Sequence, residues 1–268
     1  MSQFLLELNH RIIIYPTMPE DFILILAAFL TSTLSAIIGM GGGITLLGIM
    51  AIVMPDGFLV VAYHGIVQLV SNATRTYVFR FHIDRAILVR YSTGLFLGLF
   101  LSIVFILLLI YSFNVDSASE LTIEFLKPLI GIYILWFLFF RKKGAGVKDS
   151  AFHIMGVLSG LVTVFVGAAG PLIAPLFIAN KLTKEVIIAT KAACQALGHF
   201  LKIPIFYFLF DVSYISDWKV ILPLVISVYI GTNFGKIMLG RLSESLFKKI
   251  FRLTLTLIAI RLLLSSFY

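Results

Sequence analysis

The fold is decided by the stretch Gly39-Met40-Gly41-Gly42-Gly43, which lies inside an apolar run covering residues 22–54. A membrane span needs about 20 residues, so this run is too long for one straight helix. Glycine lets the backbone leave the helical conformation and exposes its N–H groups. At membrane depth, such backbone is tolerated only where it lines a cavity or is buried in protein. The stretch therefore predicts a helix that breaks, or turns back, inside the membrane.

The composition of the chain agrees with this membrane setting. Of the 268 residues, 60% are hydrophobic and 13% are charged, whereas soluble domains carry about 25% charged residues. The net charge of +8 is typical of Lys and Arg in cytoplasmic loops. The sequence shows no nucleic-acid-binding motif, and the lack of a P-loop argues against an ATP-driven pump. The chain is therefore predicted to be an all-α polytopic membrane protein.

Eight long apolar runs follow one another with short connectors between them. They cover residues 22–54, 58–79, 86–111, 125–140, 152–179, 186–210, 220–239 and 250–267. The fifth run resembles the first, because Gly167-Ala168-Ala169-Gly170-Pro171 interrupts it. We expect about eight transmembrane segments in two repeats, each of which opens with a broken or re-entrant helix.

Loop charge predicts the organisation of the chain and its orientation. We expect an interfacial N-terminal segment at 1–21, a first transmembrane repeat at 22–140, a basic cytoplasmic connector at 141–151 and a second repeat at 152–268. Three arginines between residues 80 and 90 follow the second run, whereas Asp211 and Asp217 follow its counterpart. Because Lys and Arg mark the cytoplasmic side, the repeats are predicted to be inverted, with both termini outside. Eight plain helices are the competing interpretation.

Polar residues recur on one face of the helix that follows each break, at spacings of three and four. The 127-residue shift that places Gly43 on Gly170 also places Gln68 on Gln195. The same shift pairs further polar positions of the two helices: His64 with Lys191, Asn72 with His199 and Arg75 with Lys202. Polar side chains are costly at membrane depth, which indicates that these faces belong to a functional site.

The residue types on these faces favour an anionic ligand, since neither face carries Asp or Glu. The half-helices that we expect to begin after the breaks, near Ile44 and at Pro171, would direct their positive N-terminal ends to the same place. Arg75 and Lys202 lie near helix ends, from where long side chains can reach the interface. The predicted substrate-binding residues are Gly41, Gly42, Gly43, His64, Gln68, Asn72, Arg75, Gly170, Pro171, Lys191, Gln195, His199 and Lys202.

These features predict a secondary transporter of a small anion that works by alternating access between the repeats. An anion channel on the same scaffold is the alternative that the sequence leaves open. Enzymatic function is not predicted, because His64 and His199 have no carboxylate partner on these faces and no metal-binding cluster lies at depth. We expect no cofactor and no nucleic-acid partner. Coupling to a proton, in which a histidine would take part, or to a sodium ion is left open.

Three features of the sequence carry a family resemblance: the motif Leu34-Ser35-Ala36-Ile37-Ile38-Gly39-Met40-Gly41-Gly42-Gly43, the helix with Gln68 and Asn72, and a second copy at residues 160–175. In these features, and in size and duplication, the chain resembles the sulfite exporter TauE/SafE family, also called the toluene-sulfonate uptake permease group. The resemblance implies an inner-membrane carrier of the bacterial type for small sulfur-containing anions such as sulfite, thiosulfate or sulfonates.

Overall fold

A computed structural model describes residues 18–54, 57–113, 132, 134–140, 148–167, 169–179, 182–210 and 212–264. Residues 1–17 of the proposed interfacial segment, half of the fourth apolar run and most of the basic connector lie outside the described residues, while residues 18–21 form the first turn of a helix. Every regular element in the described part is a helix, which confirms the predicted all-α class.

The helices follow the predicted apolar runs closely. Their order is α2 (Met18–Ile38), α3 (Gly42–Val53), α4 (Gly57–Val78), the short 3-10 helix η1 (Arg80–His82), α5 (Arg85–Phe113), the π-helical turn η3 (Trp136–Phe140), α7 (Asp149–Val166), α8 (Gly170–Ala179), α9 (Lys184–Leu209), α10 (Trp218–Leu239) and α11 (Glu244–Leu264). The first and fifth runs are each divided into two helices, as the glycine stretches predict.

Four helices of the described part are long and apolar enough to cross a membrane: Glu20–Ile38, Arg85–Ser112, Lys184–Leu209 and Trp218–Leu239. Helices α7 and α8 are apolar but shorter. Helix α4 has 22 residues, yet its polar residues make it less apolar than the four. The structure is thus that of a helical membrane protein, while the number of spans and their grouping into repeats stay predictions.

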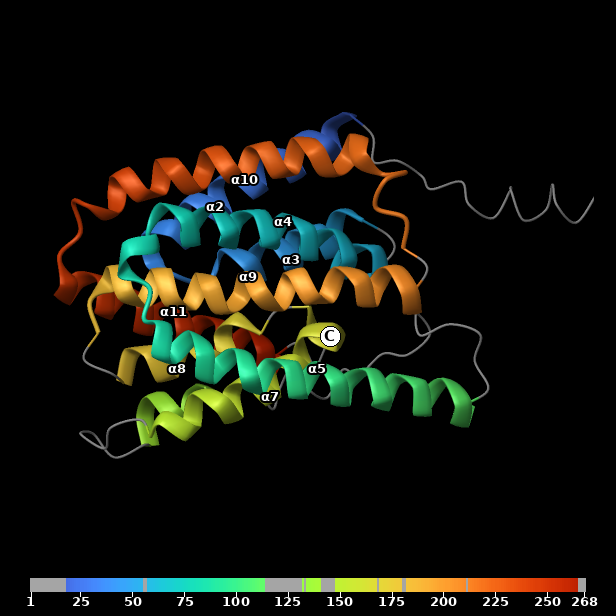
Figure 1. Cartoon of the computed structure of the whole chain (residues 1–268). Coiled ribbons are helices and arrows are strands. Elements are labelled where there is room, and N and C mark those ends of the chain that lie inside the picture. The colour runs from blue at the N-terminus through green and yellow to red at the C-terminus, as the bar shows by residue number, and fades with distance from the viewer. Residues whose placement is uncertain are drawn as a thin grey trace, which may run out of the picture.

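The helices form three layers (Figure 1). Helix α2 packs on α10 at one side and α5 packs on α7 at the other, while α4 and α9 pack on each other between them. Small residues bring the outer pairs together: a Cβ on Gly94 or Gly98 of α5 would overlap the backbone of α7, and a Cβ on Gly231 would overlap Ser32 of α2. Such contacts let helix backbones approach closely in a membrane.

The first break reverses the direction of the chain. Gly39 and Gly41 have φ angles of 81° and 89°, which residues other than glycine rarely adopt. A Cβ on Gly42 would overlap the carbonyl oxygen of Thr31, so the start of α3 lies directly against α2. In an unbroken helix these two residues would be separated by roughly 16 Å. Helix α3 begins at Gly42 rather than near Ile44, where the sequence placed it.

The second break has a similar backbone. Helix α7 ends at Gly167, whose φ angle is 79°, and α8 begins at Gly170, one residue before the predicted start. Pro171 occupies the first turn of this ten-residue helix, where the N–H has no intrahelical acceptor, whereas Pro175 lies inside the helix. All eight residues from Gly170 to Phe177 are buried. The second short helix is therefore enclosed by protein.

The last helix begins six residues before the predicted run at 250–267. Ser243 caps it, because its hydroxyl accepts a hydrogen bond from the Leu246 N–H at 3.3 Å. Phe247 and Phe251 are buried, whereas Lys249 is exposed. Lys248 and Lys249 interrupt the continuous apolar run, so the predicted run does not include this first turn, although its apolar face has helical spacing.

Candidate functional site

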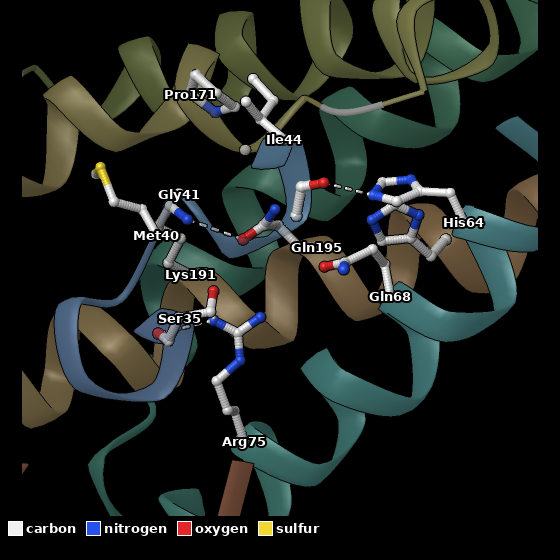
Figure 2. Close-up of a pocket in the computed structure, with 13 residues that line it drawn as sticks. Ser35, Met40, Gly41, Ile44, His64, Gln68, Arg75, Pro171, Lys191 and Gln195 are labelled. Atoms are coloured by element: carbon white, nitrogen blue, oxygen red, sulfur yellow. Dashed lines mark hydrogen bonds between the residues drawn. The ribbon is translucent and has the colours of Figure 1, made fainter. Parts of the chain in front are cut away.

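A small cavity lies where the two short helices meet α4 and α9 (Figure 2). Its volume is about 20 Å³, which is room for about one water molecule. Its lining residues come from both halves of the chain: Ser35, Met40, Gly41, Gly43, Ile44, His64, Gln68, Arg75, Gly170, Pro171, Lys191, Gln195 and His199. The N-terminal ends of α3 and α8 thus face the same cavity as the polar residues of α4 and α9.

The first turn of each short helix contains a glycine that lies against a glutamine. A Cβ on Gly43 would come within 2.9 Å of Gln68 Oε1, and a Cβ on Gly170 would overlap Gln195 Nε2. The two pairs are related by the 127-residue shift found in the sequence. Both glutamines therefore need the absence of a side chain at the start of the facing helix, and their amides are held at the two helix N-termini.

Arg75 of α4 extends to the end of α2. Its guanidinium donates hydrogen bonds to the Ser35 carbonyl oxygen at 3.2 Å and to the Ser35 hydroxyl at 2.9 Å. A third donor reaches Asn72 Oδ1 at 2.5 Å. Asn72 in turn donates to the Gln68 carbonyl oxygen at 2.8 Å. Ser35 and Arg75 both line the cavity (Figure 2), while Asn72 holds the arginine from behind.

Two lysines of α9 also bond to backbone carbonyl groups. Lys191 Nζ donates to the Gly39 carbonyl oxygen at 3.0 Å and to Gln195 Oε1 at 2.9 Å. Lys202 Nζ donates to the Val61 carbonyl oxygen at 2.9 Å and lies 5.0 Å from the centre of the Phe206 ring. Lys191 therefore ties α9 to the first break, and Lys202 ties it to α4.

The expectation that Arg75 and Lys202 reach the membrane interface is wrong. Their exposed fractions are 2% and 0%, and that of Lys191 is 2%. Each side chain instead finds acceptors inside the protein, which costs less than leaving the donors unpaired. In the described part of the chain, none of the three forms an ion pair with a carboxylate. The surroundings of the cavity therefore carry buried positive charge that hydrogen bonds satisfy but do not cancel.

Two histidines complete the wall between α4 and α9. The rings of His64 and His199 meet edge to face, with 6.0 Å between their centres. His64 Nε2 donates to the carbonyl oxygen of Gly43 at 2.8 Å. The Nδ1 atoms of both histidines are buried, and no hydrogen-bond partner for either lies among the described residues. The histidines therefore add two buried nitrogens whose hydrogen-bonding capacity the described part of the chain does not use.

Ten of the thirteen predicted residues line the cavity, and three do not. Gly42 packs on α2, Asn72 holds Arg75, and Lys202 bonds to the Val61 carbonyl oxygen of α4. The prediction missed Ser35, Met40 and Ile44. Met40 and Ile44 are apolar residues of the break and carry no sequence signal of their own. Ser35 is a polar residue one turn before the break, where a hydroxyl inside an apolar helix could have been noticed.

Comparison with known proteins yields one clear relationship. No significant match to the chain occurs among curated proteins or among solved structures. The family model described as Sulfite exporter TauE/SafE matches residues 24–262, a range that includes both breaks and every residue of the cavity. The chain therefore belongs to the sulfite exporter TauE/SafE family of membrane transporters.

Proposed function

We propose that the chain is a secondary transporter of a small anion, a sulfur-containing oxyanion or an organosulfonate, which binds in the cavity between α3, α4, α8 and α9. The observation that carries this proposal is the set of three buried cations at and behind the cavity, without a carboxylate partner among the described residues. One charged side chain at membrane depth costs about 2.5–3.5 kcal/mol on insertion scales. A bound anion offsets that cost in a way that neutral carbonyl groups cannot.

The helix ends and the amides suit the same ligand. The first N–H groups of α3 have no acceptor in a preceding helical turn. At the start of α8, Pro171 has no N–H and the Leu172 N–H donates to the Ala169 carbonyl oxygen at 3.1 Å, which leaves the Gly170 N–H. Both helix ends carry partial positive charge. Gln68 and Gln195 add side-chain N–H donors at those two ends. Amide and charged donors together can surround the several oxygens of a sulfite or sulfonate group. An inorganic cation would find no carboxylate in this cavity.

Several contacts support an arrangement in two inverted repeats. Helix α2 corresponds to α7 and α5 to α10, and the packing pairs cross between the halves, α2 with α10 and α7 with α5. Helices α4 and α9 correspond to each other and pack together. The Gln68–Gly43 and Gln195–Gly170 contacts are related in the same way. These are the relations expected of two similar halves around a pseudo-two-fold axis.

The small volume of the cavity bears on the mechanism. A space for about one water is too small for a sulfonate, so the anion enters only if side chains move. The Lys191–Gln195 hydrogen bond and the Arg75–Ser35 bonds are the contacts that the anion would replace. In this proposal the anion binds Lys191 and Arg75 in place of their present hydrogen-bond partners. One half of the protein then moves against the other, and the cavity opens on the second side of the membrane. The two breaks act as re-entrant hairpins.

The small volume of the cavity also favours a carrier over the alternative, an anion channel. An open anion pore needs a continuous aqueous path, whereas the cavity here is narrow and its cations are engaged. We therefore expect uptake of thiosulfate or sulfite into proteoliposomes to saturate and to be accelerated by the same anion inside. Large ohmic currents without saturation would favour the channel.

A double variant tests the site. Gln68→Leu with Gln195→Leu keeps the side-chain size but removes both amides, and we expect it to abolish uptake while folded protein is retained. Asn233→Leu is a matched control, because Asn233 bonds to the Tyr229 carbonyl oxygen of its own helix at 2.8 Å and does not line the cavity. Transport by the double variant at the level of the control would refute the assignment of the site.

A further inference from the structure

A second and larger hollow opens between α4, α5 and α9. Its volume is about 510 Å³, within the range of about 300–1,000 Å³ that is typical of ligand sites. The space exists because three of its lining side chains are small: Ala73 of α4, and Ala193 and Ala196 of α9. The hollow does not share a lining residue with the candidate anion cavity, so it needs an explanation of its own.

The walls of the hollow are chemically apolar. Its two aliphatic hydroxyl groups are satisfied inside their own helices, because Thr76 Oγ1 donates to the Asn72 carbonyl oxygen at 2.8 Å and Ser92 Oγ donates to the Leu88 carbonyl oxygen at 2.7 Å. The other walls are aliphatic, apart from Tyr77 and Arg80 at one end. An occupant would therefore meet hydrocarbon along most of the hollow.

One end of the hollow is cationic. Arg80 donates a hydrogen bond to the Tyr77 carbonyl oxygen at 3.0 Å, and its guanidinium carbon lies 4.6 Å from the centre of the Tyr77 ring and 4.5 Å from that of Phe81. In the described part of the chain, Arg80 has no carboxylate partner. The nearby Asp84 carboxylate is engaged with the Ile87 N–H at 3.1 Å. The guanidinium is thus held in place, exposed and unpaired.

The two ends of the hollow, at Arg80 and at Ala73, lie at different depths in the bilayer. Arg80 lies in the turn between α4 and α5, whereas Ala73 lies seven residues earlier, roughly 10 Å further along the helix. Tyr77 and Phe81 are exposed at the same end, as aromatic residues often are at the membrane interface. The hollow therefore begins at an interface with a cation and extends toward the hydrocarbon core.

We propose that this hollow binds an anionic glycerophospholipid, with one acyl chain between α4, α5 and α9 and the headgroup phosphate on Arg80. The match is one of shape and charge: an apolar space that starts at a fixed guanidinium fits an amphiphile with a negative headgroup. Because α4 and α9 carry the candidate anion site on other faces, the lipid would also hold these two helices together. This proposal does not rest on the proposed transport function.

The test uses the purified full-length chain in detergent with phosphatidylglycerol or phosphatidylcholine, read out by native mass spectrometry and by thermal unfolding. We expect retained phosphatidylglycerol and a higher unfolding temperature, with a weaker effect of phosphatidylcholine. Arg80→Gln should weaken phosphatidylglycerol binding about fivefold and remove the preference between the lipids. Arg252→Gln, at an exposed site on α11, is the matched control and should behave as the unmodified chain.

A second variant tests the acyl-chain space. Ala196→Leu extends a side chain into the hollow and should reduce the binding of both lipids, with the headgroup preference kept. Equal binding of the two lipids by the unmodified chain would overturn the proposal. So would unchanged binding in both Arg80→Gln and Ala196→Leu, or a dimer whose contact through this hollow is lost in Ala196→Leu.

Discussion

Replacing Gly170 by alanine separates the role of this glycine in binding from its role in the backbone. Unlike Gly39, Gly41 and Gly167, Gly170 does not have a positive φ. It opens helix α8, where alanine is favoured over glycine by up to about 1 kcal/mol. The added Cβ would, however, overlap Gln195 Nε2 and lie 3.3 Å from Gln195 Cδ. The flexible end of Gln195 can move away, so the helix tolerates the change while the amide leaves its position.

The expected effect is on affinity. A hydrogen bond to a charged group contributes about 1.5–3 kcal/mol, so loss of the Gln195 contact should raise Kd roughly 10- to 150-fold. Gly43→Ala should act in the same direction but less strongly, because its Cβ would lie 2.9 Å from Gln68 Oε1. Neither substitution should lower the unfolding temperature of the substrate-free protein.

The assay is titration calorimetry of the purified chain with thiosulfate, together with thermal unfolding. Gly41→Ala is the contrasting variant, since at φ 89° a side chain is strained by about 1–2 kcal/mol. That variant should lose stability. The reasoning fails if Gly170→Ala binds thiosulfate as tightly as the unmodified chain, or if its unfolding temperature falls as far as that of Gly41→Ala.

Two further predictions concern topology and charge. Single cysteines introduced at Lys148 and Thr183, both exposed, should react with an impermeant maleimide from the same side of the membrane; labelling from opposite sides would rule out the inverted arrangement and favour eight plain spans. Lys191→Met should leave the unfolding temperature without substrate almost unchanged, because removal of a buried charge (about 2.5–3.5 kcal/mol) offsets the loss of a donor for Gly39 and Gln195 (about 1–3 kcal/mol for each group). Thiosulfate should no longer stabilise this variant, and a retained thermal shift would contradict the role of the lysine.

The division into helices was accessible from the sequence because length and glycine act locally. An apolar run of 33 residues with Gly39 to Gly43 inside it is too long for one straight span, and φ angles of 81° and 89° occur at the expected residues. The start of α11 was missed because Lys248 and Lys249 interrupt the apolar run. Continuous hydrophobicity is a weaker guide there than the helical spacing of Phe247 and Phe251.

The candidate site could be predicted only in part from the sequence. Helical spacing places Gln68 and Arg75 on one face of α4, and the internal shift supplies their counterparts on α9. Spacing cannot say how far a long side chain extends, which is why Arg75 and Lys202 were expected at the interface. Their partners, the Ser35 and Val61 carbonyl oxygens, lie on other helices. Because every residue has a backbone carbonyl group, the sequence does not indicate which one accepts a hydrogen bond.

The central claim is that an anion binds between the two helix breaks. Crystals grown with selenite, the selenium analogue of sulfite, would locate it directly through anomalous scattering. We expect one strong selenium peak in the cavity between Gln68 and Gln195, within hydrogen-bonding distance of the N-terminal ends of α3 and α8. A selenium peak at another site only, or an empty cavity at a selenite concentration that saturates binding in solution, would contradict the account.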